Sequence, residues 1–143
     1  MTETKQKLAE YAAMKNKISR LSTQIEELEE MSKSIKTATD FSRIRVRSSA
    51  KKEAAFEETV AKIDELIRKR TEYMSTLIDM TEDVEKIIRQ LKKNPVLEDV
   101  LWYRYVKAMH IKDIAEQMHY SEQYIYELLQ KALQKLEEIE TSE

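Results

Sequence analysis

Two stretches of this chain repeat apolar residues at alternating steps of three and four, and no other feature limits the fold as strongly. This spacing places one apolar stripe along a helix and is typical of a heptad seam. The first seam is Tyr11, Met14, Ile18, Leu21, Ile25, Leu28, Ser32 and Ile35, and the second is Phe56, Val60, Ile63, Ile67, Arg70, Met74, Leu77, Thr81, Val84, Ile88 and Leu91. We therefore predict two long helices that form an antiparallel, coiled-coil-like hairpin.

Arg70 and Thr81 are polar residues within the second seam. A polar residue at a seam position costs stability but can fix the register or the number of partners. A bent or frayed point in the long helix is the other interpretation. The sequence leaves both interpretations open.

The composition agrees with an all-α fold. Among 143 residues there is no glycine and a single proline, Pro95, so turn-rich sheets are disfavoured and we expect no β-sheet. The absence of cysteine excludes a disulfide framework and a cysteine-rich zinc site. The first residues precede no apolar h-region, and no eighteen apolar residues run together, so we expect a chain that is neither secreted nor membrane-spanning.

The heptad register is lost over 36–49, where hydroxyl side chains favour turns and caps over helix interiors. We expect a connector here, with Ser48 or Ser49 as the N-cap of the second helix. Within 36–52, six basic side chains stand against the single acidic Asp40, so this basic connector carries a net charge of +5 in a chain of net charge -2. Its cations are Lys36, Arg43, Arg45, Arg47, Lys51 and Lys52.

Asn94 and Pro95 mark the clearest boundary in the sequence. The residue before a proline is pushed out of the α-helical region, and Asn94 can cap a helix that starts at Pro95. We therefore expect a hairpin domain over 1–94 and a module of three helices over 95–143, with helices at 95–107, 111–118 and about 122–139. The residues predicted to form the core of this module are Leu97, Val100, Leu101, Tyr105, Ile114, Ala115, Met118, Ile125, Leu128, Leu129, Leu133 and Leu136.

Two histidines stand at the ends of the predicted helix 111–118. His119 follows the helix where a left-handed backbone is common, and histidine enters that region more often than most non-glycine residues. His110 precedes the helix at the usual position of a capping serine or threonine. Because no cysteine or ligand-spaced carboxylates accompany them, we expect capping and turn roles, with no metal and no cofactor.

Three runs in the last third of the chain form one continuous pattern. They are Val100-Leu101-Trp102-Tyr103-Arg104-Tyr105, Asp113-Ile114-Ala115-Glu116-Gln117-Met118, and Ser121 through Leu136, which ends in Lys131-Ala132-Leu133-Gln134-Lys135-Leu136. This pattern resembles the C-terminal region (region 4) of bacterial sigma factors, a helix-turn-helix that reads the upstream promoter element. The whole layout, a helical hairpin followed by this sigma-like module, also resembles the small phage and prophage transcriptional regulators of the ArpU and RinA type.

The resemblance implies that the helix over 122–139 enters the major groove of promoter DNA. Gln123 and Tyr126 are the first choices for base contact, because glutamine pairs with adenine and tyrosine reaches phosphate or a thymine methyl group. Ser121 is expected to cap the helix and to touch phosphate. The full set of predicted DNA-binding residues is Ser121, Glu122, Gln123, Tyr124, Tyr126, Glu127, Gln130, Lys131 and Lys112.

The charge of the module departs from the sigma pattern, which carries arginines at several of these positions. Residues 96–143 hold five basic against ten acidic side chains, a net charge of -5, and fewer cations weaken binding to DNA. The same face could instead meet a protein such as RNA polymerase, with its tyrosines as anchors. Alternatively, cations of the basic connector could contact the DNA backbone, and a solvated, partly disordered loop is the other interpretation of such a run. These connector residues are Arg43, Arg45, Arg47, Lys51 and Lys52.

A lone hairpin with two seams leaves long apolar edges, so we expect hairpins to associate into a homodimer or a higher homo-oligomer. Such a dimer would pair two DNA-binding modules. A closed monomeric hairpin is the alternative. The residues expected to carry oligomerisation are Ile18, Leu21, Ile25, Leu28, Val60, Ile63, Ile67, Met74, Leu77 and Val84.

These patterns together predict a phage or prophage late-gene activator that binds double-stranded promoter DNA in the cytoplasm of a bacterial host. A DNA-packaging adaptor similar to a small terminase subunit is one alternative, although those proteins usually place the DNA-binding module first. A coiled-coil protein whose module binds RNA polymerase rather than DNA is another. We expect no catalytic residues, because the serines lack a histidine and aspartate set and the carboxylates are scattered along helix faces.

Overall fold

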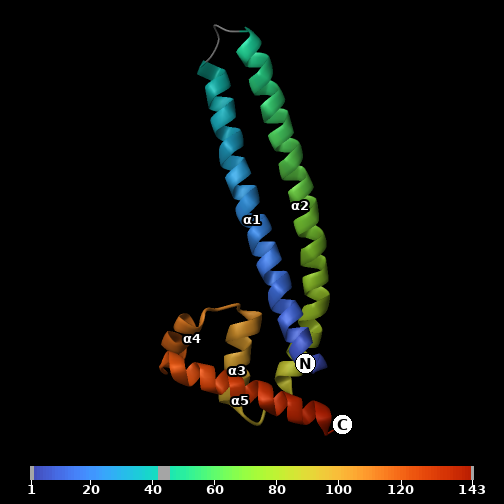
Figure 1. The fold of residues 1–143 in the computed structure, drawn as a ribbon, viewed down its shortest axis with the longest axis vertical. Helices are drawn as coiled ribbons and strands as arrows, with labels where there is room; N and C mark the ends of the chain where they lie inside the picture. The colour runs from blue at the N-terminus through green and yellow to red at the C-terminus, as the bar shows by residue number, and fades with distance from the viewer. Residues whose placement is uncertain (1, 42–45, 143) are drawn as a thin grey trace. The chain divides into compact units, whose positions relative to one another are not determined.

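The computed structural model describes residues 2–41 and 46–142, and over this part of the chain the fold is all-helical, with 89% helix and no strand (Figure 1). The fold class predicted from the sequence is confirmed at this level. The elements are α1 (Glu3–Phe41), α2 (Val46–Arg89), α3 (Pro95–Leu101), the π-helix η1 (Trp102–Val106), α4 (Ile111–Met118) and α5 (Glu122–Thr141). None of the helices in the described ranges combines the length and the apolar character that a bilayer crossing requires.

The chain divides into two compact units, and both long helices contribute to each. Unit 1 consists of Met1–Lys15 and Thr76–Glu143, and unit 2 of Asn16–Ser75. The boundary expected at Asn94 therefore lies inside unit 1. The start of α1 and the end of α2 belong to the same compact body as α3, α4 and α5.

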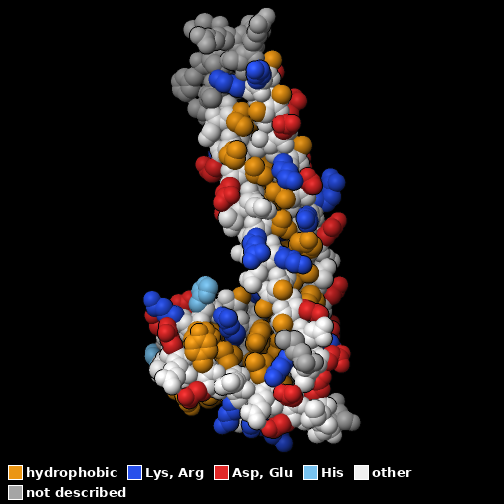
Figure 2. All heavy atoms as spheres, viewed as in Figure 1, with side chains coloured by type: hydrophobic (Ala, Val, Ile, Leu, Met, Phe, Trp, Pro, Cys, Tyr) orange, Lys and Arg blue, Asp and Glu red, His pale blue; other side chains and the backbone are white. Residues whose placement is uncertain are grey.

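In unit 2, α1 and α2 run antiparallel around a small apolar core. Its buried members are Leu21 and Ile25 from α1 and Ile63 and Leu66 from α2, with Leu28, Ile67 and Tyr73 packed against them. On the face drawn in Figure 2, hydrophobic side chains run along the two helices between charged ones. The first seam predicted from the sequence thus supplies the α1 side of this core.

The second seam was predicted wrongly at Val60 and Met74, and buried Leu66 was missed beside the predicted Ile67, which packs against the core. Leu66 is buried and Tyr73 packs against the core, whereas Val60 is 37% exposed and Met74 is 47% exposed. Apolar residues stand at both 66 and 67 and at both 73 and 74, so two alternations of three and four fit the same sequence. Periodicity alone could not choose between them, because both place an apolar stripe along the helix.

The two polar positions of the second seam meet polar partners on α1. In unit 2, Arg70 Nη1 donates a hydrogen bond to Ser22 Oγ at 3.2 Å. In unit 1, the hydroxyl groups of Tyr11 and Thr81 lie 3.1 Å apart within a hydrogen bond. Since α2 continues as one helix through both positions, neither of them marks a break. These bonds match the interpretation in which polar seam residues select the register of the pair.

The connector expected over 36–49 is wrong in its extent. The backbone stays helical to Phe41 and is helical again from Val46, so Ser48 and Ser49 lie inside α2 and not at its N-cap. Hydroxyl residues weaken a helix by only a fraction of a kcal/mol each, about 0.5, and extending a helix that already exists is far easier than starting one. Arg43 and Arg45 lie outside the described residues.

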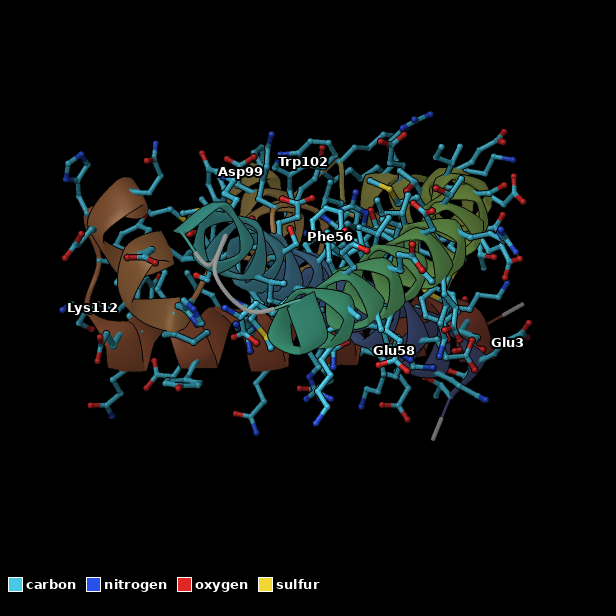
Figure 3. All side chains as sticks on the ribbon, turned by 90° about the horizontal axis from the view of Figure 1, so that it is seen from above. Glu3, Phe56, Glu58, Asp99, Trp102 and Lys112 are labelled. Atoms are coloured by element: carbon cyan, nitrogen blue, oxygen red, sulfur yellow. The ribbon has the colours of Figure 1, made fainter. Side chains whose placement is uncertain are left out.

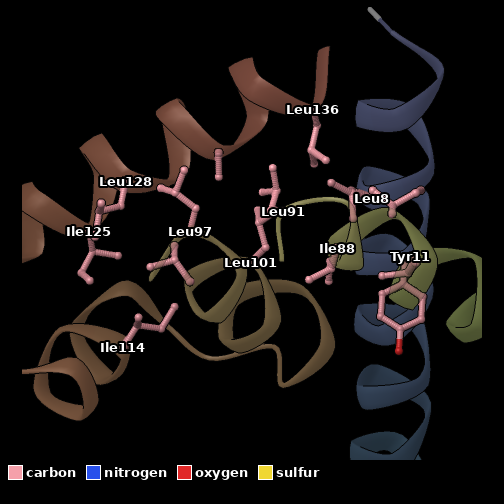
Figure 4. Packing of buried hydrophobic residues seen from close by; sticks show 14 of the residues in the cluster. Leu8, Tyr11, Ile88, Leu91, Leu97, Leu101, Ile114, Ile125, Leu128 and Leu136 are labelled. Carbon is pink, nitrogen blue, oxygen red and sulfur yellow. The ribbon is translucent and has the colours of Figure 1, made fainter. Parts of the chain in front are cut away.

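The core of unit 1 joins residues from both ends of the sequence (Figure 4). Leu8 and Tyr11 of α1 pack with the end of α2 and with α3, α4 and α5 in one cluster. Its buried members are Leu8, Tyr11, Val84, Ile87, Ile88, Leu91, Leu97, Val100, Leu101, Ile114, Ala115, Ile125, Leu128, Ala132 and Leu136. Every core residue predicted for the module is buried in this cluster or packs against it, so that prediction is confirmed.

Polar contacts add to the attachment of the N-terminal segment within unit 1. The backbone N–H of Glu3 donates to Glu140 Oε1 at 3.1 Å, and Lys5 Nζ pairs with Glu137 Oε2 at 3.1 Å. Lys15 Nζ donates to the backbone carbonyl of Val106, the last residue of η1. The segment from Glu3 to Lys15 is therefore held at both α5 and η1.

Two non-glycine residues of unit 1 have a left-handed backbone. His119 has φ 61° and ψ 43° at the C-cap of α4, as predicted from the sequence, and Ala108, which was not predicted, has φ 54°. A Cβ atom in this region costs roughly 1–2 kcal/mol, and histidine tolerates it better than alanine does. Both positions therefore store a modest strain.

Glycine at these two positions is expected to stabilise unit 1. For His119→Gly we expect a change in the free energy of unfolding between none and about 1 kcal/mol of gain, and for Ala108→Gly a larger gain of about 1 kcal/mol, because alanine is the less tolerant residue. Thermal unfolding of the two variants measures this. A clear fall in melting temperature for either variant would contradict it.

Tyr105 makes the stability of unit 1 sensitive to alkaline pH. Its burial raises the pKa of the phenol above the usual 10.0, and the positive charges of Arg104 and Lys5 act in the opposite direction. A pKa raised in the folded state means that this contribution to stability is complete below the unfolded pKa and is lost as the pH rises through the folded pKa. Tyr105→Phe should therefore reduce the loss of melting temperature between about pH 9 and about pH 11.

The pKa of Lys15 is shifted in the opposite direction, so its effect on stability must be separated from that of Tyr105. Burial, followed by the charge of Lys107, lowers the pKa of Lys15 from 10.5, so its contribution to stability is lost as the pH falls through the folded pKa. The lysine is common to the wild type and to Tyr105→Phe, so the difference between their pH profiles isolates the phenol. Identical profiles would rule out a role for Tyr105.

Candidate nucleic-acid interface

The candidate interface lies on α4 and α5, which are joined by a turn of His119, Tyr120 and Ser121. The N–H of His119 and the N–H of Tyr120 both return to the carbonyl of Ala115, which closes the end of α4. Ser121 Oγ accepts from the N–H of Tyr124 at 3.1 Å, so Ser121 is the N-cap of α5, as predicted. The turn is fixed at both ends by hydrogen bonds.

Buried residues hold the two helices against each other. Ile114 and Ile125 are fully buried, and Ala115 and Leu128 are nearly so. These residues pack α4 against α5, and α3 packs against α5 as well (Figure 4). The opposite side of the first turns of α5 is consequently directed away from the core.

All nine residues predicted to bind DNA are exposed. On α5, Gln123, Tyr126 and Gln130 follow one another at steps of three and four, and they share one face of the helix. Tyr126 is 61% exposed and Tyr124 is 41% exposed. Lys112 extends outward from the first turn of α4 (Figure 3). The exposed set is Ser121, Glu122, Gln123, Tyr124, Tyr126, Glu127, Gln130, Lys131 and Lys112.

An aromatic pair fixes the start of this surface. The rings of Tyr120 and Tyr124 lie edge to face, with centroids 4.9 Å apart and planes at 76°. Such a pair adds about 0.5–1.5 kcal/mol beyond the area that it buries, so the two rings restrain each other. Tyr120 is itself 40% exposed and thus extends the surface from α5 onto the turn. Its aromatic character was not noted in the sequence.

The electrostatic character of this surface is mixed. Lys112 and Lys131 are its cations, and Glu122 and Glu127 stand on the same turns of α5. Glu122 suits the first turn of a helix, where the partial positive charge of the backbone N–H groups favours an acidic side chain. The chemistry of the surface is therefore that of hydrogen bonds and aromatic contact more than of net charge.

The other predicted site residues lie elsewhere. Lys51 is exposed and Lys52 is half-buried in unit 2. Arg47 is part of helix α2, and the remaining arginines of the basic connector are outside the described residues. Of the residues expected to carry oligomerisation, four are buried within the single chain, four are partly exposed, and Val60 and Met74 are exposed. The buried four are Leu21, Ile25, Ile63 and Val84, and the partly exposed four are Ile18, Leu28, Ile67 and Leu77.

The histidines flank α4 in the predicted places. His110 is the N-cap residue, with an extended backbone but no side-chain cap hydrogen bond, so the capping role proposed for its ring is not seen. In the ranges that the structure describes, no group of three or more His, Cys, Asp or Glu side chains could hold a metal ion.

The N-terminal segment, which was not predicted to join this unit, packs in the core that α4 and α5 share. Leu8 and Tyr11 lie at the end of that core near Leu136, whereas Ile114 and Ile125 lie at the other end (Figure 4). Leu8 stands three residues before Tyr11 and so continues the first seam, but this spacing does not tell which element Leu8 packs against.

Comparisons with known proteins give no relative: no family model, no curated protein and no solved structure matches this chain.

Proposed function

We propose that this chain is a sequence-specific DNA-binding transcriptional regulator, and that α4, the turn and α5 form its helix-turn-helix. The main support for this proposal is the first half of α5, which is exposed along one face. A three-residue turn joins it to α4 and is fixed by hydrogen bonds at both ends. The major groove of B-DNA admits a helix presented in this way. The resemblance of residues 100–136 to the sigma region points to the same helix. The layout of the whole chain, which resembles regulators of the ArpU and RinA type, adds the phage or prophage late-gene activator as the biological setting.

The residues divide into two roles in this proposal. Gln123 and Tyr126 would contact base edges, since they stand one turn apart near the start of α5. Ser121, Lys112 and Lys131 would contact phosphate and set the position of the helix on the duplex. The exposed N–H groups at the start of α5 favour a phosphate at the same place.

The small number of cations predicts a weak dependence on salt. With two phosphate contacts per module, affinity should fall only about tenfold between about 50 and about 200 mM salt, since the slope is roughly 0.9 per contact. Two modules on one duplex would double the slope. A homodimer is therefore part of the proposal, because one module with so few cations would bind DNA weakly.

A second candidate function is favoured by the exposed tyrosines together with the net charge of -5 over 96–143. In this alternative the same face docks on a protein, such as RNA polymerase, with Tyr124 and Tyr126 as anchors. Tyrosine is enriched among the residues that dominate protein interfaces. Binding would then survive in the absence of DNA.

The test is a selection of fragments from the genome that encodes the chain, performed on the purified protein at moderate salt and repeated with Gln123→Ala/Tyr126→Ala. We expect one promoter region to be enriched by the wild type and lost with the double variant. A matched control is Gln134→Ala, an exposed glutamine farther along α5 that is outside the proposed interface.

Two results would count against DNA recognition by α5. If the wild type enriches no DNA fragment, the result favours the alternative in which this face binds a protein, and capture of purified RNA polymerase becomes the next measurement. If a promoter is enriched equally by both proteins, the DNA contact lies outside the first half of α5, with the basic connector as the next candidate.

A further inference from the structure

Unit 2 has an apolar groove between its two helices. The groove has a volume of about 460 Å³, and its floor consists of Leu21, Leu28 and Leu66. Met31 lies beside the floor and is 54% exposed, so it extends the apolar surface of the groove. The rims are formed by Gln24 and Glu27 on α1 and by Lys62 and Lys69 on α2.

The charges of the two rims are opposite. Glu27 stands on the α1 rim, whereas Lys62 and Lys69 stand on the α2 rim. Lys62 makes an exposed pair with Glu65 of its own helix at 3.5 Å, and such pairs are weak and easily exchanged. Lys69 lies 6.0 Å from the ring centroid of Tyr73. A partner that covers this groove must offer an apolar centre, with a basic edge toward α1 and an acidic edge toward α2.

A second copy of this groove meets those requirements in one of two symmetric arrangements. When the two-fold axis runs along the helices, α1 of one copy faces α2 of the other, and each Glu27 meets the lysines of the second copy. When the axis runs across the helices, α1 faces α1, so glutamates meet glutamates and lysines meet lysines. Like charges brought together across an interface are unfavourable, and the parallel arrangement is therefore selected.

The area available suits a dimer of moderate affinity. About 20 residues of each helix span about 30 Å, and two helices side by side offer a face about 20 Å wide. Covering this face would bury roughly 600 Å² per copy and roughly 1,200 Å² in all, which is the lower end for specific interfaces. We expect a dissociation constant in the micromolar range.

We propose that the groove of unit 2 is the dimer interface of this protein and that two copies associate in parallel as a four-helix bundle, with Glu27 of each chain against Lys62 and Lys69 of the second copy. Both chains then leave the bundle at the same end toward their unit 1. The proposal does not depend on DNA binding, because its test requires no DNA.

The experiment is sedimentation equilibrium on the full-length chain at low and moderate salt. The wild type should be a dimer at tens of micromolar, and Glu27→Lys should weaken the dimer at least tenfold, because three lysines then meet in each half of the interface. Adding Lys62→Glu and Lys69→Glu to Glu27→Lys should restore the dimer, since the opposite charges are only exchanged. The matched control is Glu26→Lys, which makes the same change at an exposed residue that does not line the groove.

The orientation is tested by disulfide formation, since the chain contains no cysteine. When the single variants Gln24→Cys and Lys69→Cys are mixed, the parallel arrangement predicts that the mixed disulfide exceeds either homodimeric one. The proposal is overturned if the wild type is monomeric at about 100 µM, where a micromolar dimer would be formed. It is also overturned if Glu26→Lys acts like Glu27→Lys, if the triple variant fails to regain the dimer, or if the mixed disulfide is not preferred.

Discussion

Leu8→Ala should lower the stability of unit 1 by about 3 kcal/mol, with a fall in melting temperature of roughly 10–20 °C. Leu8 is fully buried, and it packs with Tyr11, Val84 and Leu136 in the core that lies beneath α5. Truncating a buried leucine loses its transfer free energy and leaves a cavity that a close-packed core fills only in part. Thermal and urea unfolding of the full-length chain measure the effect.

The control for this experiment is Ile78→Ala, a similar truncation on α2 at a side chain that is 72% exposed. We expect its stability to stay within about 0.5 kcal/mol of the wild type. A fragment that begins at Asn94 offers a second measurement. It lacks Leu8, Tyr11 and the last turns of α2, so we expect it to lose fixed tertiary packing. A fragment as stable as unit 1 would show that the N-terminal segment is dispensable.

Substitutions at two adjacent residues of α5 should have opposite effects, one on stability and the other on DNA binding. Ile125 is fully buried and Tyr126 is 61% exposed. Ile125→Ala should cost about 2–5 kcal/mol, because it empties the contact between α4 and α5. Tyr126→Ala should leave stability within about 0.5 kcal/mol of the wild type and abolish promoter enrichment.

Each of these variants serves as the control of the other. Unfolding curves separate the loss of the fold from the loss of the proposed contact, and DNA binding is measured below the melting temperature of the weaker variant. A large fall in stability for Tyr126→Ala would mean that its ring supports the helix. Unchanged DNA enrichment would remove Tyr126 from the proposed interface.

Sequence patterns were sufficient for the elements whose signals are local. Pro95 starts α3, Ser121 caps α5, and His119 ends α4 in the left-handed region, because each of these roles depends on one residue type and its immediate neighbours. The core of the C-terminal module followed from helical periodicity over short stretches. Buried Ala132 was missed, since a small side chain contributes little to an apolar pattern.

Contacts between residues far apart in the chain could not be predicted from the sequence pattern. Leu66 and Ile67 are equally apolar neighbours, and only the partner helix decides which of them is buried. The role of Leu8 depends on contacts with residues more than seventy positions away, which no local pattern reports. For the candidate interface, the exposure of α5 was predicted, whereas the ring contact between Tyr120 and Tyr124 depends on the shape of the turn.

The composition of unit 1 from two distant segments has a consequence for the order of folding. The 60 residues of unit 2 separate Lys15 from Thr76, and closing a flexible loop of that length costs roughly 3–4 kcal/mol of chain entropy. When α1 and α2 pair first within unit 2, that cost is met before the core around Leu8 assembles. Substitutions at Ile63 or Leu66 should therefore slow the assembly of that core although neither side chain belongs to it. In kinetic terms, the paired helices would act as the nucleus from which unit 1 condenses.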